Sequence, residues 1–405
     1  MPDATGAGAW PSIGHEQRPW RHESTAPASR TARRRHRGPY HAAVPPLAAS
    51  LAVTLPGEVA AGVDDAAAEV ARFDAELGRE LAPFAAVLLR TESAASSRIE
   101  NLTASARAIA EAEIGPVRSR NASLVVANER AIRAAIGLAE RIDGQAILTM
   151  HEALLGASAP DIAGRWREDQ VWIGGRDLGP HEALFVPPHH ERVPAAIDDL
   201  VAFIDRDDVP VLAHAALAHA QFETIHPFPD GNGRVGRALV HAQLRSKGLT
   251  RNVTVPLSAG LLTDTDAYFE ALTRYREGDH LAIVGQFTTA AFRAVANGRR
   301  LADDLHAIRA QWQDRITARR GAVVWRIADL LLRRPVVNAR VIADELGIAS
   351  QNTYRSLARL IDAGVVVEFT DRKRNRMWRA PEVLEALDRF AARAGRRTRA
   401  GGGRE

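Results

Sequence analysis

Residues 226–237 read HPFPDGNGRVGR, and this stretch decides how the rest of the chain is interpreted. It gathers one histidine, one acid, three glycines, one asparagine and two arginines between two apolar segments. Apolar residues then recur from Val235 to Ala242 at the i, i+3, i+4, i+7 spacing of a helix with one buried face. The spacing predicts that DGNG (230–233) lies at the N-terminus of that helix. Such a loop is either a polar helix cap or a cradle for phosphate with a base beside it.

The glycines and arginines of the stretch favour the phosphate cradle. Unpaired backbone N–H groups and the helix dipole attract an anion to a helix N-terminus. Gly231 and Gly233 would let the backbone approach a ligand closely, because they carry no side chain. Arg234 and Arg237 add positive charge three residues apart. A simple helix cap does not need all four positions together.

The acid and the histidine supply reactive groups. Asp230 would repel a bare phosphate, but it suits Mg²⁺, which bridges carboxylate and phosphate oxygens. The ordinary pKa of a histidine such as His226 lies near physiological pH, so its ring can take a proton from a hydroxyl. Phe228 lies between them and is expected to plug the core and fix the loop.

Composition limits the alternatives. The chain has 405 residues, of which 46% are hydrophobic, so it can form two to three domains with packed cores. It has no cysteine, which excludes disulfides, thiolate zinc sites and a cysteine nucleophile and fits a cytoplasmic protein. No segment has the apolar length of a membrane span, and the N-terminus lacks a signal pattern, so no membrane partner is expected. The net charge of +4 is uneven, because arginines cluster at 30–37, 372–379 and 393–399.

The residue pattern predicts a mainly α fold. Helical periodicity runs from Pro56 to about residue 320, broken at 165–194, where two apolar runs around a Gly-rich turn predict a β-hairpin. Residues 321–390 read as three helices and two strands around a basic turn, the order of a winged helix-turn-helix. The first 45 residues lack a period and enough apolar surface to order themselves. The expected domains are a disordered basic tail (1–45), an N-terminal helical region (46–140), a catalytic core (141–312), a winged helix (313–390) and a flexible tail (391–405).

HPFPDGNGRVGR resembles the signature of the Fic (filamentation induced by cAMP) family, HPFx[D/E]GNGRxxR, with every specified position present. The resemblance extends over about residues 45–385. It implies a Fic helical core with a β-hairpin flap, and the flap would pair with an extended segment of a target protein. Family members transfer AMP from ATP to a hydroxyl of a target protein. The resemblance therefore implies a protein adenylyltransferase that uses ATP and Mg²⁺.

Roles carry over by position. His226 resembles the general base that deprotonates a Ser, Thr or Tyr hydroxyl of the target, and Asp230 resembles the Mg²⁺ ligand. Arg237 resembles the arginine that holds the γ-phosphate. Tyr268 resembles a residue near the adenine, with plain packing as the alternative. The full set of nucleotide contacts that the resemblance implies is Gly231, Asn232, Gly233, Arg234, Arg237 and Tyr268.

A second resemblance concerns regulation. Residues 96–101, SSRIEN, match the inhibitory motif [S/T]xxxE[G/N] of the family through Ser96, Glu100 and Asn101. In members of this type the glutamate pairs with the second arginine of the signature, which here is Arg237. Glu100 would then occupy the guanidinium that should receive the γ-phosphate. An exposed helix that happens to carry a glutamate is the alternative.

Three functions follow from these features. The first is an autoinhibited adenylyltransferase, and the second is the reverse reaction, removal of AMP from a modified protein by the same site. The third is a DNA-binding regulator with a Fic sensor domain, although winged helices also dock proteins. Members of this type often form homodimers. The cations expected to contact DNA are Arg355, Arg359, Arg372, Lys373, Arg374 and Arg376.

Overall fold

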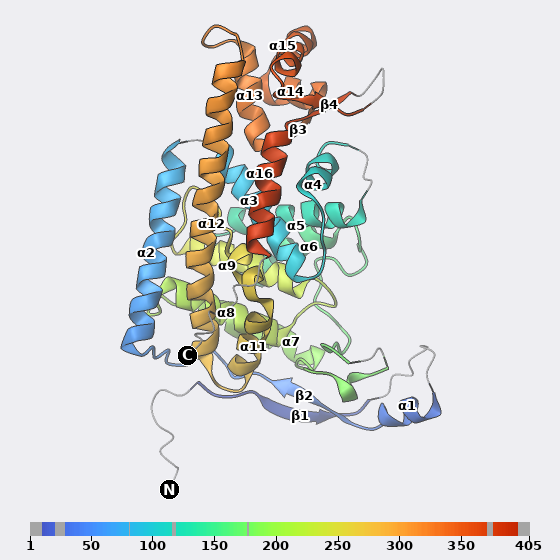
Figure 1. Ribbon diagram of the computed structural model, residues 1–405. Coiled ribbons are helices and arrows are strands. Elements are labelled where there is room, and N and C mark those ends of the chain that lie inside the picture. The colour runs from blue at the N-terminus through green and yellow to red at the C-terminus, as the bar shows by residue number, and fades with distance from the viewer. Residues whose placement is uncertain are drawn as a thin grey trace, which may run out of the picture. The chain divides into compact units, whose positions relative to one another are not determined.

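The computed structural model describes residues 10–20, 29–80, 82–115, 119–175, 178–370 and 376–395, and it is mainly helical, as the sequence predicts (Figure 1). The helices are α1 (Arg30–Arg35), α2 (Gly57–Glu80), α3 (Ala82–Ile99), α4 (Ala106–Ala112), α5 (Arg120–Gly137), α6 (Gly144–Leu155), α7 (Val193–Ile204), α8 (Val211–Ile225), α9 (Asn232–Ser246), α10 (Leu257–Leu261), α11 (Thr265–Arg276), α12 (His280–Arg315), α13 (Val323–Arg333), α14 (Ala339–Leu346), α15 (Ser350–Asp362) and α16 (Pro381–Ala394). The strands are β1 (Gly14–Arg18), β2 (Tyr40–Val44), β3 (Val336–Asn338), β4 (Val367–Glu368) and β5 (Met377–Arg379). Single 3₁₀ turns lie at Pro180–Glu182, His190–Arg192 and Leu262–Asp264.

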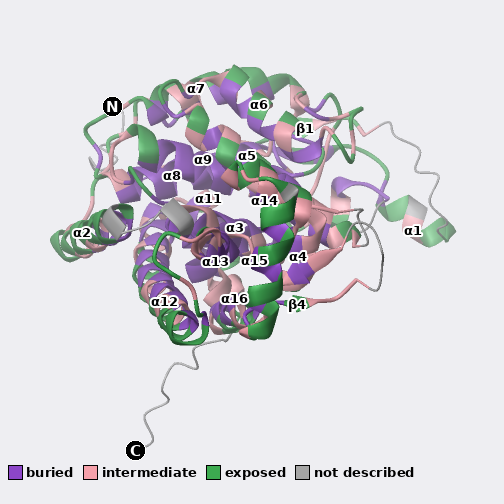
Figure 2. Cartoon of the chain, turned by 90° about the horizontal axis from the view of Figure 1, so that it is seen from above, coloured by how far each residue is buried: buried purple, intermediate pink, exposed green. Residues whose placement is uncertain are grey.

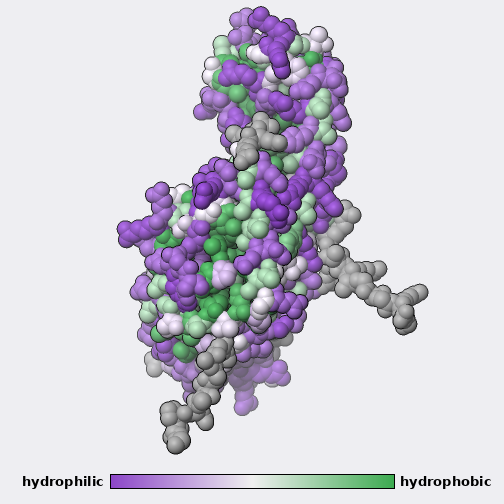
Figure 3. Space-filling model, turned by 90° about the vertical axis from the view of Figure 1, so that its left-hand side faces the viewer, coloured by the Kyte–Doolittle hydropathy of each residue, from purple (hydrophilic) through white to green (hydrophobic). Residues whose placement is uncertain are grey.

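The chain forms two compact units. The first comprises residues 1–67, 131–247 and 266–288, and the second comprises 68–130, 248–265 and 289–405. The sequences of α2, α5 and α12 run across the boundaries between these ranges. None of the described helices combines the length and the apolar content that crossing a bilayer requires. On the face drawn in Figure 3, hydrophilic residues predominate around smaller apolar patches.

Helix α8 lies in the core of the first unit. Every residue from Leu212 to Ile225 is buried, and Figure 2 shows the helix in the colour of buried residues. Its alanine-rich sequence favours a helix and lets its neighbours α7 and α9 approach closely. A Cβ added to Gly236 of α9 would lie 2.9 Å from Cδ1 of Phe222. The helices on either side of the HPFPDGNG loop are therefore held at close range.

The expected disorder of residues 1–45 is wrong for the described residues of that segment. Strand β1 pairs antiparallel with β2, with Gly14 opposite Val44. Trp10 is 4% exposed and packs against the rings of Tyr275 and His280, with centroids 5.6 and 5.4 Å away. One large aromatic side chain inserted into the core anchors a segment whose average composition predicts disorder. Residues 1–9 and 21–28 lie outside the described residues.

The β-hairpin expected at 165–194 is reduced to one antiparallel bridge, Ile173 with Phe185. The Ile173 N–H donates to the Phe185 carbonyl at 2.8 Å, and the Phe185 N–H donates back at 3.2 Å. Ala43 of β2 donates its N–H to the Val186 carbonyl at 3.0 Å, so β2 lies beside this bridge. Residues 176 and 177, in the turn between the two runs, lie outside the described residues.

The end of the second unit contains the three predicted helices and the two predicted strands, with a further strand that the sequence analysis did not predict. Strand β3 lies between α13 and α14, strands β4 and β5 follow α15, and the sheet order is β3-β5-β4 with both pairs antiparallel. Arg355 and Arg359 are exposed on α15. Arg376 instead pairs with Glu368, with Nε donating at 2.6 Å, which neutralises one of the cations expected to meet DNA. Residues 371–375, with Arg372, Lys373 and Arg374, lie outside the described residues.

The expected flexible end at 391–405 begins inside a helix. Helix α16 continues to Ala394 because Phe390 and Ala394 are buried. Arg393 also donates from Nε to the side-chain oxygen of Asn297 at 2.6 Å. Residues 396–405 lie outside the described residues.

Candidate active site

His226 ends α8 in a left-handed backbone conformation. Its φ and ψ are 50° and 62°, and its N–H donates to the Phe222 carbonyl at 2.8 Å. This region is costly for a residue with a side chain, so neighbouring contacts must hold the turn. The chain leaves α8 here and enters the PFPD loop.

Arg167 supplies those contacts, and sequence reasoning missed it. Its backbone N–H donates to the Pro227 carbonyl at 3.0 Å, and its Nε donates to the His226 carbonyl at 2.8 Å. Its other guanidinium nitrogens donate to the carbonyls of Asp169 at 3.1 Å and Pro188 at 2.5 Å. Burial lowers the pKa of Arg167 to about 10, so the group stays charged at neutral pH. One buried cation therefore ties the turn at His226 to both sides of the Ile173–Phe185 bridge.

The imidazole of His226 is neutral at physiological pH. Its side chain is 19% exposed, and its Nδ1 lies 3.7 Å from a carboxylate oxygen of Glu223. Burial, together with the positive charges of Arg276 and Arg167, lowers the pKa of His226 to about 3. A neutral ring can accept a proton, and a pKa of about 3 makes it a weaker base than an ordinary histidine, whose pKa lies near the operating pH that favours general base catalysis.

Arg276 is a second residue that the sequence did not single out. Its guanidinium lies over the ring of Phe185, 3.8 Å from the centroid, and its charge acts on His226. Burial lowers the pKa of Arg276 to about 10. The sequence TRYREG gives no signal that this arginine would lie between the bridge and the histidine.

The loop after His226 is fixed from within. Asn232 accepts the Phe228 N–H on Oδ1 and donates to the Phe228 carbonyl from Nδ2, both at 2.8 Å. Phe228 is fully buried, as predicted, and its ring stacks on His151 with centroids 3.7 Å apart. The Gly164 N–H donates to Nδ1 of His151 at 3.0 Å, so Nε2 carries the proton that is donated to the Asp230 carbonyl at 3.0 Å.

Gly231 places the N-terminus of α9 at the end of this loop. Its φ is 83°, and an added Cβ would lie 2.9 Å from Cδ2 of Leu154, so both conformation and space require glycine. The first α9 bond runs from the Val235 N–H to the Gly231 carbonyl at 2.9 Å. The first N–H groups of an α-helix have no acceptor in a preceding turn, and this arrangement at the start of α9 attracts an anion.

Asp230 fits a hard divalent cation. Its carboxylate is 64% exposed beside this helix N-terminus, accepts the Gly231 N–H at 2.6 Å and lies 3.4 Å from the Arg234 guanidinium. One carboxylate combined with phosphate oxygens of a substrate is a usual way for a protein to hold Mg²⁺. Arg234 and Arg237 are both buried, at 4% and 3% exposed. Buried arginines beside a helix N-terminus suit the binding of phosphate.

Tyr268 is a core residue in this structure. It is 1% exposed, and its hydroxyl lies 2.7 Å from Nε2 of His219. This geometry favours the packing alternative over a contact with adenine. Burial and the charge of nearby Arg237 lower the pKa of His219, the partner of Tyr268, to about 3.

The SSRIEN motif lies at the end of α3, in the second unit. Ser96 is fully buried and Glu100 is exposed. Asn101 adopts φ 60°, and the Leu102 N–H donates to the Ser97 carbonyl at 3.0 Å, which closes a left-handed helix end. Asparagine and glycine tolerate this conformation best, which accounts for the [G/N] position of the motif. The pairing of Glu100 with Arg237 stays a prediction.

Comparison with known proteins identifies the domain. Residues 141–244 match the Fic/DOC family. The chain is 32% identical over 136 residues to the protein adenylyltransferase Fic of Nematostella vectensis, a match covering 33% of this chain and 28% of the relative. It is 34% identical over 122 residues to a probable protein adenylyltransferase of Aquifex aeolicus (strain VF5), covering 28% of this chain and 36% of the relative. The chain thus spans only about a third of the length of these curated relatives.

A solved structure supports the fold over a longer range. The crystal structure of a Fic family protein from Desulfovibrio desulfuricans G20 matches with a TM-score of 0.52 at 21% identity. The match covers 81% of this chain and 97% of that protein. At this identity the likeness concerns the fold alone.

Proposed function

The chain carries a Fic/DOC domain at residues 141–244, and from this we propose that it is an autoinhibited protein adenylyltransferase. It would transfer AMP from ATP to a Ser, Thr or Tyr hydroxyl of a target protein and of itself. One observation carries the proposal. A single fixed loop connects His226, which is neutral and partly exposed, to the N-terminus of α9. The adenylyltransferase relatives support the same reaction.

In the proposed reaction, His226 takes the proton of the target hydroxyl. The oxygen attacks the α-phosphorus of ATP, a new P–O bond forms, and the bond to the pyrophosphate oxygen breaks. The N–H groups at the start of α9, with Arg234 and Arg237, would stabilise the charge on the phosphate oxygens. Asp230 would hold Mg²⁺, which supplies further neutralisation of that charge. Arg167 would keep His226 in place while the proton moves.

The target would dock on the flap, which we define as residues 171–173 and 183–186. Leu184 is 88% exposed beside the Ile173–Phe185 bridge, and an exposed apolar side chain there suits a contact with an extended peptide. Since β2 already bonds Val186, the target segment would add to the other edge of the flap, at residues 171–173.

The proposed location is the cytoplasm, because a reducing compartment suits a chain without cysteine.

Autoinhibition would come from Glu100. We propose that its carboxylate pairs with Arg237 and competes with the γ-phosphate for the guanidinium. The same glutamate could instead position a water for removal of AMP, so the direction of the reaction is a second candidate function. A DNA-binding role of the exposed Arg355 and Arg359 on α15, and a homodimer, are further proposals from the sequence.

The test uses α-labelled ATP with the wild type, Glu100→Gly and His226→Ala. Glu100→Gly should label itself at least about tenfold more than the wild type, since removing the carboxylate frees the proposed γ-phosphate site. His226→Ala in the Glu100→Gly background should abolish labelling, because the base is gone. The matched control is Glu140→Gly, an exposed glutamate outside the motif, which should label like the wild type.

Two outcomes contradict parts of the proposal. Equal labelling of the wild type and Glu100→Gly would refute the proposed autoinhibition. Labelling that survives His226→Ala would show that His226 is not the general base. Release of AMP from a modified target by the wild type, lost in Glu100→Gly, would instead identify the reverse reaction.

A further inference from the structure

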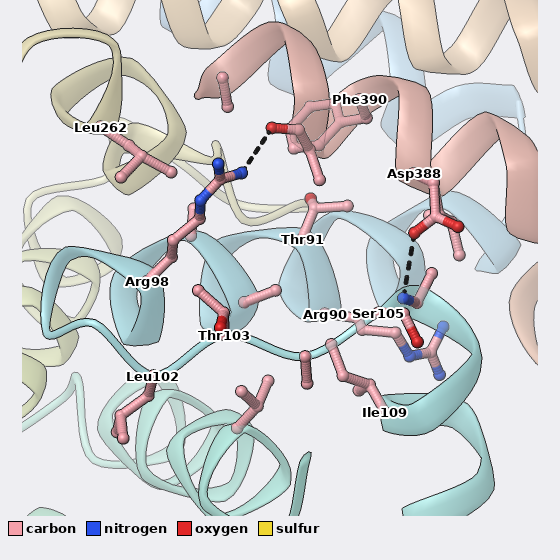
Figure 4. A pocket seen from close by; sticks show the side chains of 18 residues that line it. Arg90, Thr91, Arg98, Leu102, Thr103, Ser105, Ile109, Leu262, Asp388 and Phe390 are labelled. Atoms are coloured by element: carbon pink, nitrogen blue, oxygen red, sulfur yellow. Dashed lines mark hydrogen bonds between the residues drawn. The ribbon is translucent and has the colours of Figure 1, made fainter. Parts of the chain in front are cut away.

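A cavity of about 390 Å³ lies within the second unit, beside the helix that carries the SSRIEN motif (Figure 4). Its walls come from α3, the segment 102–105, α4 and α16. Helix α3 presents Thr91, Ala94, Ala95 and Arg98 to it, at the i, i+3, i+4, i+7 spacing of one helix face. Alanines on α3 and on the facing α16 leave the space open. The volume is that of a small-molecule site.

The charges around the cavity are unequal. Arg90 is satisfied by Glu113, with which it makes two hydrogen bonds of 2.6 and 2.9 Å. Asp388 accepts the Ala106 N–H at 3.1 Å, in the positive first turn of α4. Arg98 donates to the Ala391 carbonyl at 3.0 Å, and among the described residues it has no carboxylate partner. Arg98 and Asp388 therefore each bond to backbone, and in the described part of the chain Arg98 is the lining guanidinium that no carboxylate pairs with.

Arg98 is held at the end of the cavity by the small residues of α16. Figure 4 shows its guanidinium turned toward α16, where it bonds the backbone. A Cβ added to Gly395 would lie 2.5 Å from Nη2 of Arg98, so the guanidinium occupies the room that a side chain would take. One used donor out of five leaves N–H groups for a ligand.

We propose that this cavity binds a small amphipathic carboxylate. The apolar body would lie among Ala94, Ala95, Ile109 and Leu387, and the carboxylate would meet Arg98. A neutral apolar molecule would leave Arg98 without a charged partner. A planar guanidinium bound to a carboxylate makes two parallel hydrogen bonds, which favours a carboxylate over other small groups.

The site would act on the end of α3. The turns that contact the cavity also carry Glu100 and Asn101, whose N–H groups donate to Ser97 at 3.1 Å and Arg98 at 3.0 Å. A ligand that fits the present cavity stabilises the present conformation of these turns. If Glu100 inhibits as proposed above, binding would deepen the inhibition. The binding itself does not depend on AMP transfer, so the two proposals fail separately.

The first experiment measures binding by calorimetry with octanoate and with octan-1-ol, its neutral match. Octanoate should saturate one site per chain and bind at least about tenfold tighter than octan-1-ol. Arg98→Gln should weaken octanoate at least about tenfold and leave octan-1-ol unchanged. Arg98→Lys, which keeps the charge but loses the planar fork, should bind octanoate more tightly than Arg98→Gln and more weakly than the wild type. Arg299→Gln, a paired surface arginine outside the cavity, should change nothing.

A second variant fills the space instead of removing the charge. Ala94→Phe should abolish binding of both probes, whereas Ala86→Phe, a half-buried position of α3 outside the cavity lining, should leave it intact. Circular dichroism of each variant establishes that it is folded. Hydrogen exchange with bound octanoate should slow at the amides of Glu100, Asn101 and Leu102.

Three results would overturn the proposal. The first is the absence of saturable binding up to about 3 mM octanoate. The second is equal affinity for octanoate and octan-1-ol. The third is binding that survives both Arg98→Gln and Ala94→Phe, because the probe would then sit elsewhere. If the Glu100→Gly variant shows no AMP transfer at all, the proposed adenylyltransferase is refuted and this binding site still stands.

Discussion

Lowering the pH from 7 to 5 should reduce the free energy of unfolding by about 2 kcal/mol through His219 alone. This residue lies on α8, is 1% exposed, and contacts the Tyr268 hydroxyl at 2.7 Å. Burial, and then the charge of Arg237, lower the pKa of its ring to about 3. The ring is therefore neutral in the folded protein across the usual pH range.

The sign follows from the protons bound in each state. A histidine in the unfolded chain has a pKa of about 6.5, so below this pH the unfolded chain binds a proton that the folded chain excludes. The stability that His219 contributes is complete above about pH 6.5 and is lost as the pH falls toward 3. Each pH unit within this window is worth about 1.4 kcal/mol, and pH 5 lies about 1.5 units below the unfolded pKa. The product is about 2 kcal/mol.

Urea unfolding at pH 7 and pH 5 measures the effect. His219→Gln should be less stable than the wild type at pH 7, because it loses the packing of the ring, but its loss between pH 7 and pH 5 should be smaller by about 2 kcal/mol. His15→Gln, which changes an exposed histidine of β1, is the control and should lose as much as the wild type. An equal loss in the wild type and His219→Gln would show that His219 takes up a proton in the folded protein, and the buried arrangement behind Arg237 would be wrong.

Two further substitutions test the geometry of the loop. Gly236→Ala should lower the free energy of unfolding by about 1–3 kcal/mol, since its Cβ would lie 2.9 Å from Phe222, and an unchanged melting temperature would contradict the close approach of α8 and α9. In the Glu100→Gly background, Arg167→Gln should lower kcat for self-labelling at least about tenfold with little change in the KM for ATP, because it releases the turn at His226 without touching the phosphate loop. A raised KM with unchanged kcat would show that Arg167 serves nucleotide binding instead.

The parts of the fold that the sequence predicted are those coded locally. The helices on both sides of the loop follow from apolar periodicity and from Gly231, whose φ of 83° only glycine adopts easily. The clustering of His226, Asp230 and the α9 N-terminus follows because twelve consecutive residues carry it. The sequence also placed Phe228 correctly in the core.

The missed parts depend on contacts between distant segments. The Arg167 guanidinium bonds carbonyls up to 59 residues away, and nothing in RWREDQ distinguishes this arginine from a surface arginine. Trp10 packs on Tyr275 and His280, more than 260 residues along the chain, so a composition average over the first 45 residues gives the wrong answer. The hairpin signal at 165–194 was overestimated, since only Ile173 and Phe185 pair.

Backbone conformation links the two motifs that the sequence singled out. Among the described residues, those other than glycine with positive φ are Asn101 and His226, at the ends of α3 and α8. Each follows the last turn of its helix. Asn101 is next to the proposed inhibitory Glu100, and His226 is itself the proposed base. For Asn101 the residue type itself lowers the cost of the left-handed turn, whereas His226 has no such advantage and depends on Arg167. A histidine is retained in that turn at a cost of about 1 kcal/mol, which is expected where the imidazole is needed for chemistry and not for folding.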